Sequence, residues 1–169
     1  MSLSLKKQFE VRLGLVAPSE VVGCDYDGAG KRVLVPCPDG ELTGPDFHGT
    51  MMCAGIDHQV VRADGVTEIN ASYGFKLDDG RAVYIHVEGI RAVPDELVET
   101  VKAGGAIDPK QFYYVTTPTF EVYDESLKWM TKKIFVCDAV RLPDAVRLPD
   151  AVLLTYYTVE QVNDHPALG

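Results

Sequence analysis

Two side chains suited to acid–base chemistry stand out in the sequence. His86 lies within a segment in which apolar and polar residues alternate, and Asp57 follows Gly55 after a single residue. An imidazole titrates near neutral pH, and a carboxylate beside a glycine can approach a ligand closely. We therefore take Asp57 and His86 as the candidate general acid and base. Tyr84 or Tyr114 would donate a hydrogen bond to a developing oxyanion.

A second group of polar and aromatic side chains would bind the substrate. Some share the polar face of a predicted hairpin with His86, two are histidines on either side of Asp57, and the aromatic members could stack on a ring. Each has a structural alternative: a solvent face for the hairpin residues, a packing role for the histidines, and the core for the aromatics. The set is His48, His58, Asn70, Ser72, Tyr73, Glu88, Tyr114 and Trp129.

Metal and cofactor motifs are missing from the sequence. The four cysteines (Cys24, Cys37, Cys53 and Cys137) form no C-x-x-C pair, and the histidines show no ligand spacing. The chain also has no G-x-G-x-x-G or Walker loop in a strand–helix context and no G-x-S-x-G elbow. We expect reduced cysteines, no metal and no cofactor.

Composition and charge limit the partners. The 169 residues suit one domain, and 16 Lys and Arg against 25 Asp and Glu give a net charge of −9 without a basic cluster. Nucleic-acid binding needs such a cluster and is therefore not expected. No apolar run approaches the ~20 residues that span a bilayer, and no signal peptide is evident. We expect a cytoplasmic protein with a small-molecule partner, and leave a homo-oligomer open.

The clearest structural signal is a hairpin formed by residues 66–77 and 81–88. A two-residue loop would mix apolar and polar residues on each face. A three-residue loop with Gly80 in the left-handed region instead pairs Tyr73 with Ile85 and Ser72 with His86, which makes one face apolar and the other polar or small. Because register follows the hydrophobic pattern, we choose the second, with Ser72 and His86 predicted to face a cavity.

The rest of the chain reads as short strands and turns with one helix, residues 94–103, which begins at a proline and ends before two glycines. About eight short antiparallel strands predict an all-β fold, a closed up-and-down (calycin-like) β-barrel over residues 8–160 of a single domain. The hexamer DAVRLP occurs twice in residues 138–149. We interpret residues 138–150 as a lengthened hairpin loop, with a functional lid as the alternative, and residues 161–169 as a loose tail.

Six segments also occur in an order that resembles a known family. They are residues 54–58, 70–73, 77–80, 89–91, 113–121 and 129–136. Together they are similar to the family called domain of unknown function (DUF) 3237, also grouped as UPF0311, over residues 9–159. The resemblance implies a small antiparallel barrel around a central pocket, and it supports the fold more than the chemistry.

The departures from the family pattern bear on the ligand. Ser72 and Val115 stand where the resemblance implies arginines that point into the pocket, Asn70 replaces an aspartate, and His58 replaces a tryptophan. Fewer fixed positive charges favour a neutral or phenolic ligand over an anion.

Two functions from different classes follow. The first is a cofactor-independent enzyme, a lyase, isomerase or cyclase of secondary metabolism. It would use acid–base chemistry for isomerisation, cyclisation or hydration/dehydration of a small apolar, phenolic or polyketide-like metabolite. The alternative is a non-catalytic small-molecule-binding barrel. Histidine and carboxylate together in the pocket would favour the enzyme, and a dry aromatic pocket would favour the binding protein.

Overall fold

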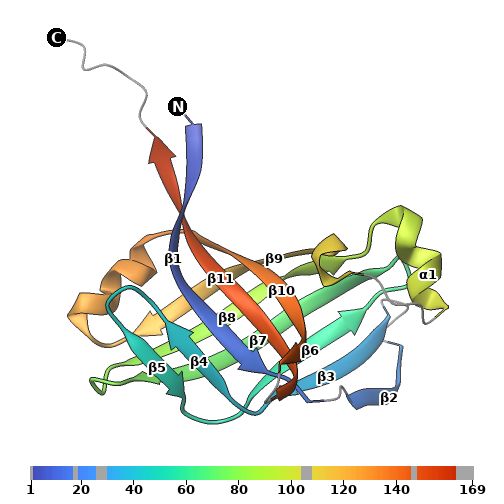
Figure 1. Ribbon diagram of the computed structural model, residues 1–169, viewed down its shortest axis with the longest axis horizontal. Helices are drawn as coiled ribbons and strands as arrows, with labels where there is room; N and C mark the ends of the chain where they lie inside the picture. Colours follow the sequence, from blue (N-terminus) through green and yellow to red (C-terminus); the bar gives the residue numbers. More distant parts are fainter. Residues whose placement is uncertain (1, 17–18, 26–29, 104–107, 146–147, 163–169) are drawn as a thin grey trace.

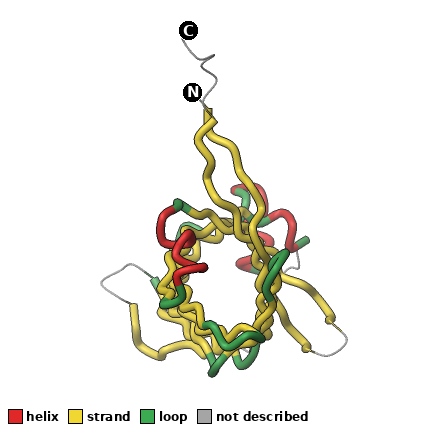
Figure 2. Tube along the Cα trace, turned by 90° about the vertical axis from the view of Figure 1, so that its left-hand side faces the viewer, coloured by secondary structure: helices red, strands yellow, loops and turns green. Residues whose placement is uncertain are grey.

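A closed ring of antiparallel strands forms the body of the protein (Figures 1 and 2). The computed structural model describes residues 2–16, 19–25, 30–103, 108–145 and 148–162. The strands are β1 (Ser2–Gly14), β2 (Ser19–Asp25), β3 (Lys31–Cys37), β4 (Gly40–Thr43), β5 (His48–Met51), β6 (Gly55–Val61), β7 (Val66–Leu77), β8 (Ala82–Ala92), β9 (Tyr113–Val122), β10 (Phe135–Ala145) and β11 (Leu148–Val162). The helical segments are η1 (Asp95–Leu97), α1 (Val98–Lys102), η2 (Pro109–Gln111) and η3 (Glu125–Lys132).

The ring follows chain order, as an up-and-down barrel requires. Pairing runs β7–β5–β4–β1–β11–β10–β9–β8 and returns to β7, so eight strands close the barrel. Strands β5 and β6 pair with two successive stretches of β7. Strand β3 pairs with β6, and β4 pairs with β5. Strand β2 pairs with the outer edge of β3. The predicted closed antiparallel barrel is confirmed.

The β7–β8 hairpin has the predicted register. Tyr73 pairs with Ile85 and Ser72 with His86, and Gly80 has φ of +91°. The apolar rows of the two strands are buried, because eight-stranded barrels leave an interior that side chains fill. The polar rows therefore lie on the outer surface of the barrel.

Aromatic packing closes one end of the barrel. Phe9 stacks on Tyr156 with ring centroids 4.6 Å apart, and Phe120 lies 4.7 Å from Phe135. Segment η3 lies at this end and buries Leu127 and Met130 in the same core. Helix α1 lies at the opposite end, beside the start of β9 and the end of β8 (Figure 1).

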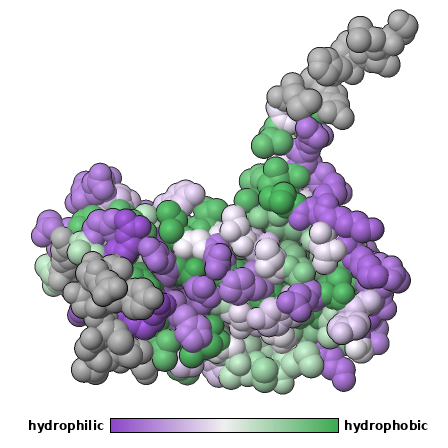
Figure 3. All heavy atoms as spheres, turned by 180° about the vertical axis from the view of Figure 1, so that it is seen from behind, coloured by the Kyte–Doolittle hydropathy of each residue, from purple (hydrophilic) through white to green (hydrophobic). Residues whose placement is uncertain are grey.

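The two terminal strands extend beyond the barrel as an arm, which we define as residues 2–7 and 157–162. These residues pair with each other, from Ser2 with Val162 to Lys7 with Tyr157. Leu3 and Leu5 on the arm are 71% and 58% exposed, and Figure 3 shows apolar surface there. The arm was not expected, because the predicted barrel begins at residue 8.

Two other elements differ from the expectation. The helix predicted over residues 94–103 is a 3₁₀ turn, Asp95–Leu97, followed by α1, which ends at Lys102. The duplicated hexamers do not form a long loop: β10 continues to Ala145, which pairs with Leu148 of β11. The predicted tail lies mostly outside the described residues. No helix in the described part of the chain is long and apolar enough to cross a membrane.

Candidate active site

The polar face of the central hairpin points away from the barrel interior, which corrects the predicted pocket role of Ser72 and His86. Ser72 Oγ lies 2.9 Å from His86 Nδ1, and His86 Nε2 lies 3.5 Å from Glu88 Oε1. The residues on either side of Ser72 and His86 along their strands are buried in the core. Since strand side chains alternate between faces, this polar row lies on the outer surface.

The same alternation places Tyr84, Asn70 and Glu88 outside. Tyr84 is 41% exposed, and Asn70 and Glu88 are exposed residues whose side chains bond each other at 3.3 Å. The physical reason is burial: filling the barrel with the apolar row removes far more apolar surface from water than filling it with this polar row. Tyr84 and His86 are therefore not paired with an interior carboxylate.

The other two candidate histidines are also on the outside. His48 is exposed and lies 3.0 Å from Asp78 Oδ2 through its Nδ1. His58 is exposed on β6, and its backbone carbonyl accepts a hydrogen bond from Arg32. Because His58 adjoins Asp57 on a strand, the two side chains leave opposite faces of the sheet. Neither imidazole therefore lies on the inner face of the barrel with the Asp57 carboxylate.

Asp57 lies inside the barrel. It is 5% exposed, and its carboxylate accepts hydrogen bonds from Gln59 Nε2 at 2.6 Å and from the backbone N–H of Asn70 at 3.1 Å. The β6–β7 ladder pairs Asp57 with Ala71 and Val60 with Glu68 but is interrupted between them. The interruption releases the Asn70 N–H from the ladder, and the Asp57 carboxylate takes it.

The interior raises the pKa of Asp57. Burial is the main cause, because a carboxylate loses hydration there. The hydrogen bonds from Gln59 and Asn70 lower the pKa, and so do the charges of Arg91 and His58. The carboxyl is thus held in a fixed orientation with its proton affinity moved toward the neutral range, which is what a general acid or base needs.

Arg91 is a site residue that was not among the predicted ones. It is half-buried on the inner row of β8, and its guanidinium carbon lies 5.4 Å from the centroid of the Phe112 ring. Burial lowers its pKa, Tyr114 and Asp57 raise it, and Arg141 lowers it. Within the described part of the chain, no side chain or backbone group accepts a hydrogen bond from this guanidinium.

Two tyrosines complete the interior polar cluster, which we define as Asp57, Gln59, Arg91, Tyr114 and Tyr73. Tyr73 is 5% exposed, and Tyr114 is half-buried on the inner row of β9. Burial raises the pKa of both phenols, and the charge of Asp57 adds to the increase. Both therefore stay protonated and can donate hydrogen bonds. The predicted binding residues Tyr73 and Tyr114 thus share the interior with Asp57.

A row of four cross-strand neighbours, Gly89, Thr116, Cys137 and Tyr156, continues from this cluster around the barrel wall. Gly89 pairs with Thr116, Thr116 with Cys137, and Cys137 with Tyr156. The Tyr156 hydroxyl is fully buried without a hydrogen-bond partner, and the Thr116 hydroxyl has at most the weak partner offered by the Cys137 thiol. Burial raises the pKa of Cys137 to about 12, so this thiol stays protonated.

Two glycines let the barrel wall close around the cluster. A Cβ on Gly55 would lie 2.8 Å from the backbone oxygen of Ser72, and one on Gly89 would lie 2.4 Å from that of Val115. Glycine permits such close backbone approach. In each case the charged cluster residue, Asp57 or Arg91, follows two positions later on the same inward face. The Gly-x-Asp and Gly-x-Arg patterns therefore have a direct structural reason.

Trp129 does not join this cluster. It belongs to η3 at the aromatic end of the barrel, where its ring lies 5.8 Å from that of Phe135. It packs partly buried against the core. Its predicted role in substrate binding at the same site as Asp57 therefore has no support in the geometry.

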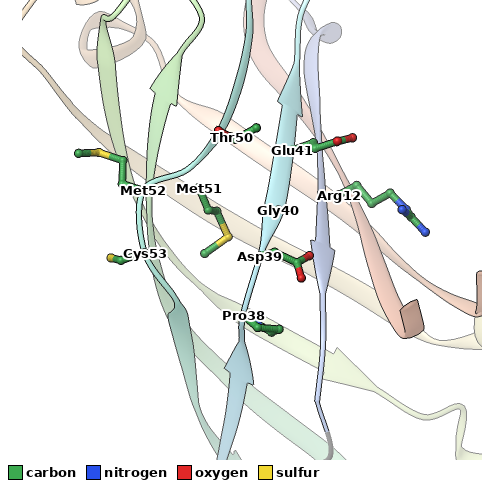
Figure 4. Close-up of a pocket in the computed structure, with 9 residues that line it drawn as sticks. All are labelled: Arg12, Pro38, Asp39, Gly40, Glu41, Thr50, Met51, Met52 and Cys53. Atoms are coloured by element: carbon green, nitrogen blue, oxygen red, sulfur yellow. The ribbon is translucent and has the colours of Figure 1, made fainter. Parts of the chain in front are cut away.

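A surface cleft of about 450 Å³ is lined wholly by described residues (Figure 4). Arg12, Asp39, Glu41 and Cys53 are among its lining residues. In Figure 4 the Met51 sulfur points toward Gly40, whereas Cys53 and Arg12 point apart. Its polar groups do not converge, so the interior cluster is the better candidate. Among the described residues, no group of three or more His, Cys, Asp or Glu could hold a metal ion.

Sequence comparison connects the chain with uncharacterised relatives. The family model "Protein of unknown function (DUF3237)" matches residues 3–159. A UPF0311 protein of Clostridium acetobutylicum is 49% identical over 123 residues, which are 73% of this chain and 77% of the relative. A UPF0311 protein of Rhodopseudomonas palustris is 36% identical over 122 residues, 72% of this chain and 80% of the relative.

Structure comparison gives the same grouping. A protein of unknown function from Clostridium acetobutylicum has a TM-score of 0.82 and 40% identity, covering 95% of this chain and 99% of that one. A "beta-barrel like protein" from Acinetobacter baumannii has a TM-score of 0.78 and 26% identity, covering 95% and 98%. An enzyme from Penicillium herquei has a TM-score of 0.64 and 18% identity, covering 95% and 96%, and this likeness concerns the fold alone.

Proposed function

This chain belongs to the DUF3237 family, and we propose that its barrel is a cofactor-independent enzyme that moves protons on a small apolar or phenolic metabolite. The observation that carries the proposal is the buried Asp57 carboxylate, oriented by Gln59 and the Asn70 N–H. A structural carboxylate at 5% exposure, lacking a direct salt bridge among the described residues, is costly to keep ionised. A role in proton transfer gives a reason for it.

Asp57 would act as the base, and its neighbours would stabilise the charge that develops. In this mechanism Asp57 takes a proton from an acidic C–H or O–H group of the substrate. Tyr114 or Tyr73 donates a hydrogen bond to the resulting enolate or phenolate oxygen, and Arg91 supplies positive charge. Asp57 then returns the proton to another atom of the substrate. Isomerisation, cyclisation and hydration/dehydration all share such a step, and the Penicillium herquei neighbour, described as an enzyme, is in keeping with it.

His86 is replaced in this mechanism by the interior tyrosines. The imidazole lies on the outer surface, so it cannot share a bound substrate with Asp57. The apolar wall that surrounds Asp57, formed in part by Val35, Ala71 and Val87, excludes water and strengthens the electrostatic effects of Arg91 and Tyr114. The wall also favours a largely apolar substrate.

The reduced cysteines Cys37, Cys53 and Cys137 are in keeping with a cytoplasmic location, and the exposed arm is in keeping with a homo-oligomer.

Proton transfer can be tested without knowing the natural substrate. The probe is 2-tetralone, a ketone fused to an aromatic ring with exchangeable benzylic α-protons, incubated with the protein in D2O and followed by NMR. We expect exchange faster than in buffer, and a loss of roughly 10²- to 10⁴-fold in Asp57→Asn. The matched control is Asp138→Asn, which alters an exposed carboxylate on β10 and should leave exchange unchanged. Equal exchange in wild type and Asp57→Asn would contradict the proposal.

A non-catalytic binding barrel is the second candidate. It is favoured by the lack of an inward imidazole among the described residues and by the aromatic packing around Phe9 and Tyr156. Under this alternative, 2-tetralone or 2-naphthol binds, measured by calorimetry, while exchange stays at the buffer rate. The two measurements together therefore separate the two functions.

A further inference from the structure

Arg91 presents an unused set of hydrogen-bond donors to the barrel interior. A guanidinium carries five N–H groups, and a buried charge is normally paired. The contact that fixes this group is with the Phe112 ring, at 5.4 Å, which leaves its edge free to donate. Asp57 does not neutralise it directly, because the described ion pairs do not include these two residues and the Asp57 carboxylate is already held by Gln59 and Asn70.

The charged and titratable groups around Arg91 favour a negative ligand. Asp57 of β6, Tyr114 of β9 and Arg141 of β10 are the groups whose charges act on it. Tyr114 is the direct cross-strand neighbour of Arg91, and burial keeps its phenol protonated, so it does not neutralise the guanidinium. An anionic group on a ligand would supply the direct ionic partner that Arg91 lacks among the described residues.

A second observation, independent of Arg91, also points to a polar ligand group. The Tyr156 hydroxyl is 0% exposed and has no hydrogen-bond partner. Its charge environment includes Tyr114, so the unused hydroxyl lies near the same cluster. An unpaired buried hydroxyl is costly, and such groups in native proteins commonly mark a place where a ligand or an ordered water belongs.

We propose that the interior site binds its ligand as an oxyanion, a phenolate or enolate oxygen held by the Arg91 guanidinium and the Tyr114 hydroxyl, with the Tyr156 hydroxyl available to a second polar atom of the ligand. This inference rests on the proposed function and names its substrate class: a small aromatic or enolic compound with an acidic hydroxyl. It revises the sequence-based expectation, since Arg91 supplies the positive charge that Ser72 and Val115 lack.

The test uses 4-nitrophenol, whose phenolate absorbs at a different wavelength from the phenol, and 4-nitroanisole, its neutral analogue. Wild type should bind the phenolate more tightly than the anisole. Absorbance should then show that bound nitrophenol ionises at a lower pH than free nitrophenol. Arg91→Met should weaken phenolate binding by roughly 10- to 100-fold, the scale of a charge-assisted hydrogen bond, and leave anisole binding unchanged. The control Arg12→Met, at the outer cleft, should bind both as wild type does.

Each outcome has a distinct meaning. Equal or tighter binding of the anisole by wild type overturns the inference, whatever the variants do, and leaves the tetralone exchange result standing. Phenolate binding without exchange in Asp57-intact protein supports the oxyanion site and removes the catalytic proposal. If circular dichroism shows that Arg91→Met does not fold, Arg91→Lys and Arg91→Gln replace it. Bound nitrophenol that still ionises at the lowered pH in Arg91→Lys, but not in Arg91→Gln, supports the role of the charge. Binding of neither probe by wild type counts against the inference.

Discussion

Replacing Tyr156 with phenylalanine should stabilise the ligand-free protein. The Tyr156 hydroxyl is fully buried and makes no hydrogen bond, while its ring stacks on Phe9 with centroids 4.6 Å apart. A buried, unsatisfied polar group costs about 1–3 kcal/mol, and phenylalanine keeps the ring and its packing. We expect Tyr156→Phe to raise the free energy of unfolding by about 1–2 kcal/mol.

The assay is urea unfolding monitored by circular dichroism, with thermal unfolding as a second measurement. A gain of that size corresponds to a Tm increase of roughly 2–8 °C, at the usual ~2–4 °C per kcal/mol for a chain of this length. The m value should not change, because the same surface is buried. The matched control is Tyr157→Phe, the next residue on β11, which is partly exposed on the outer face and should change stability by less than about 0.5 kcal/mol.

A destabilised Tyr156→Phe would refute the reasoning, because it would mean that the hydroxyl makes a favourable hydrogen bond in the ligand-free protein. The same substitution should also weaken 4-nitrophenol binding if the hydroxyl serves the ligand. Higher stability with weaker binding is the usual exchange at functional sites.

Three further predictions follow from the same structure. Gly89→Ala should destabilise the protein by roughly 1–3 kcal/mol in urea unfolding, because its Cβ would lie 2.4 Å from Val115 O. The control Gly74→Ala should be nearly neutral, because its Cβ would come no closer than 3.8 Å to Met52 Sδ. Equal effects of the two substitutions would contradict this. The unfolding free energy of wild type, relative to that of Asp57→Asn, should fall as the pH rises from about 4 toward 8. Folding raises the pKa of Asp57, so the stability that its protonated form contributes is lost as the pH rises through the folded pKa. A difference in unfolding free energy that grows over this range would contradict the prediction. Deleting residues 144–149 should leave a folded barrel by circular dichroism, since the pair Leu142–Ala151 survives and the two residues between them form a short loop; loss of folding would make the second hexamer structural.

The sequence was sufficient for the strands of the central hairpin but not for the direction in which its faces point. Alternation in residues 66–77 and 81–88 defines two faces and one register, and both are present. Which face turns inward depends on how the closed ring is filled. The apolar row of Tyr73 and Ile85 fills it, so Ser72 and His86 turn outward.

Only part of the interior cluster could be predicted from the sequence. Asp57 was found because it follows Gly55, and the same signal, Gly89 followed by Arg91, was present in the sequence but was used only to support the family resemblance. Arg91 and Asp57 lie 34 positions apart on different strands, so their proximity depends on the tilt and stagger of the barrel. Thr116 and Tyr156 look like ordinary strand residues, and only burial without a partner distinguishes them.

The seam between β1 and β11 has a consequence for how the chain folds during synthesis. Ser2 pairs with Val162, and every contact along this seam joins residues far apart in sequence. The opposite edge of β1 can pair with β4 early, over Glu10 to Leu13, but the other edge has no partner until β11 leaves the ribosome. Such nonlocal pairing is slow, and an open strand edge is prone to association with other chains. We therefore expect ring closure to be a late step of folding, with the free edge of β1 exposed until then to a chaperone or to a second nascent chain.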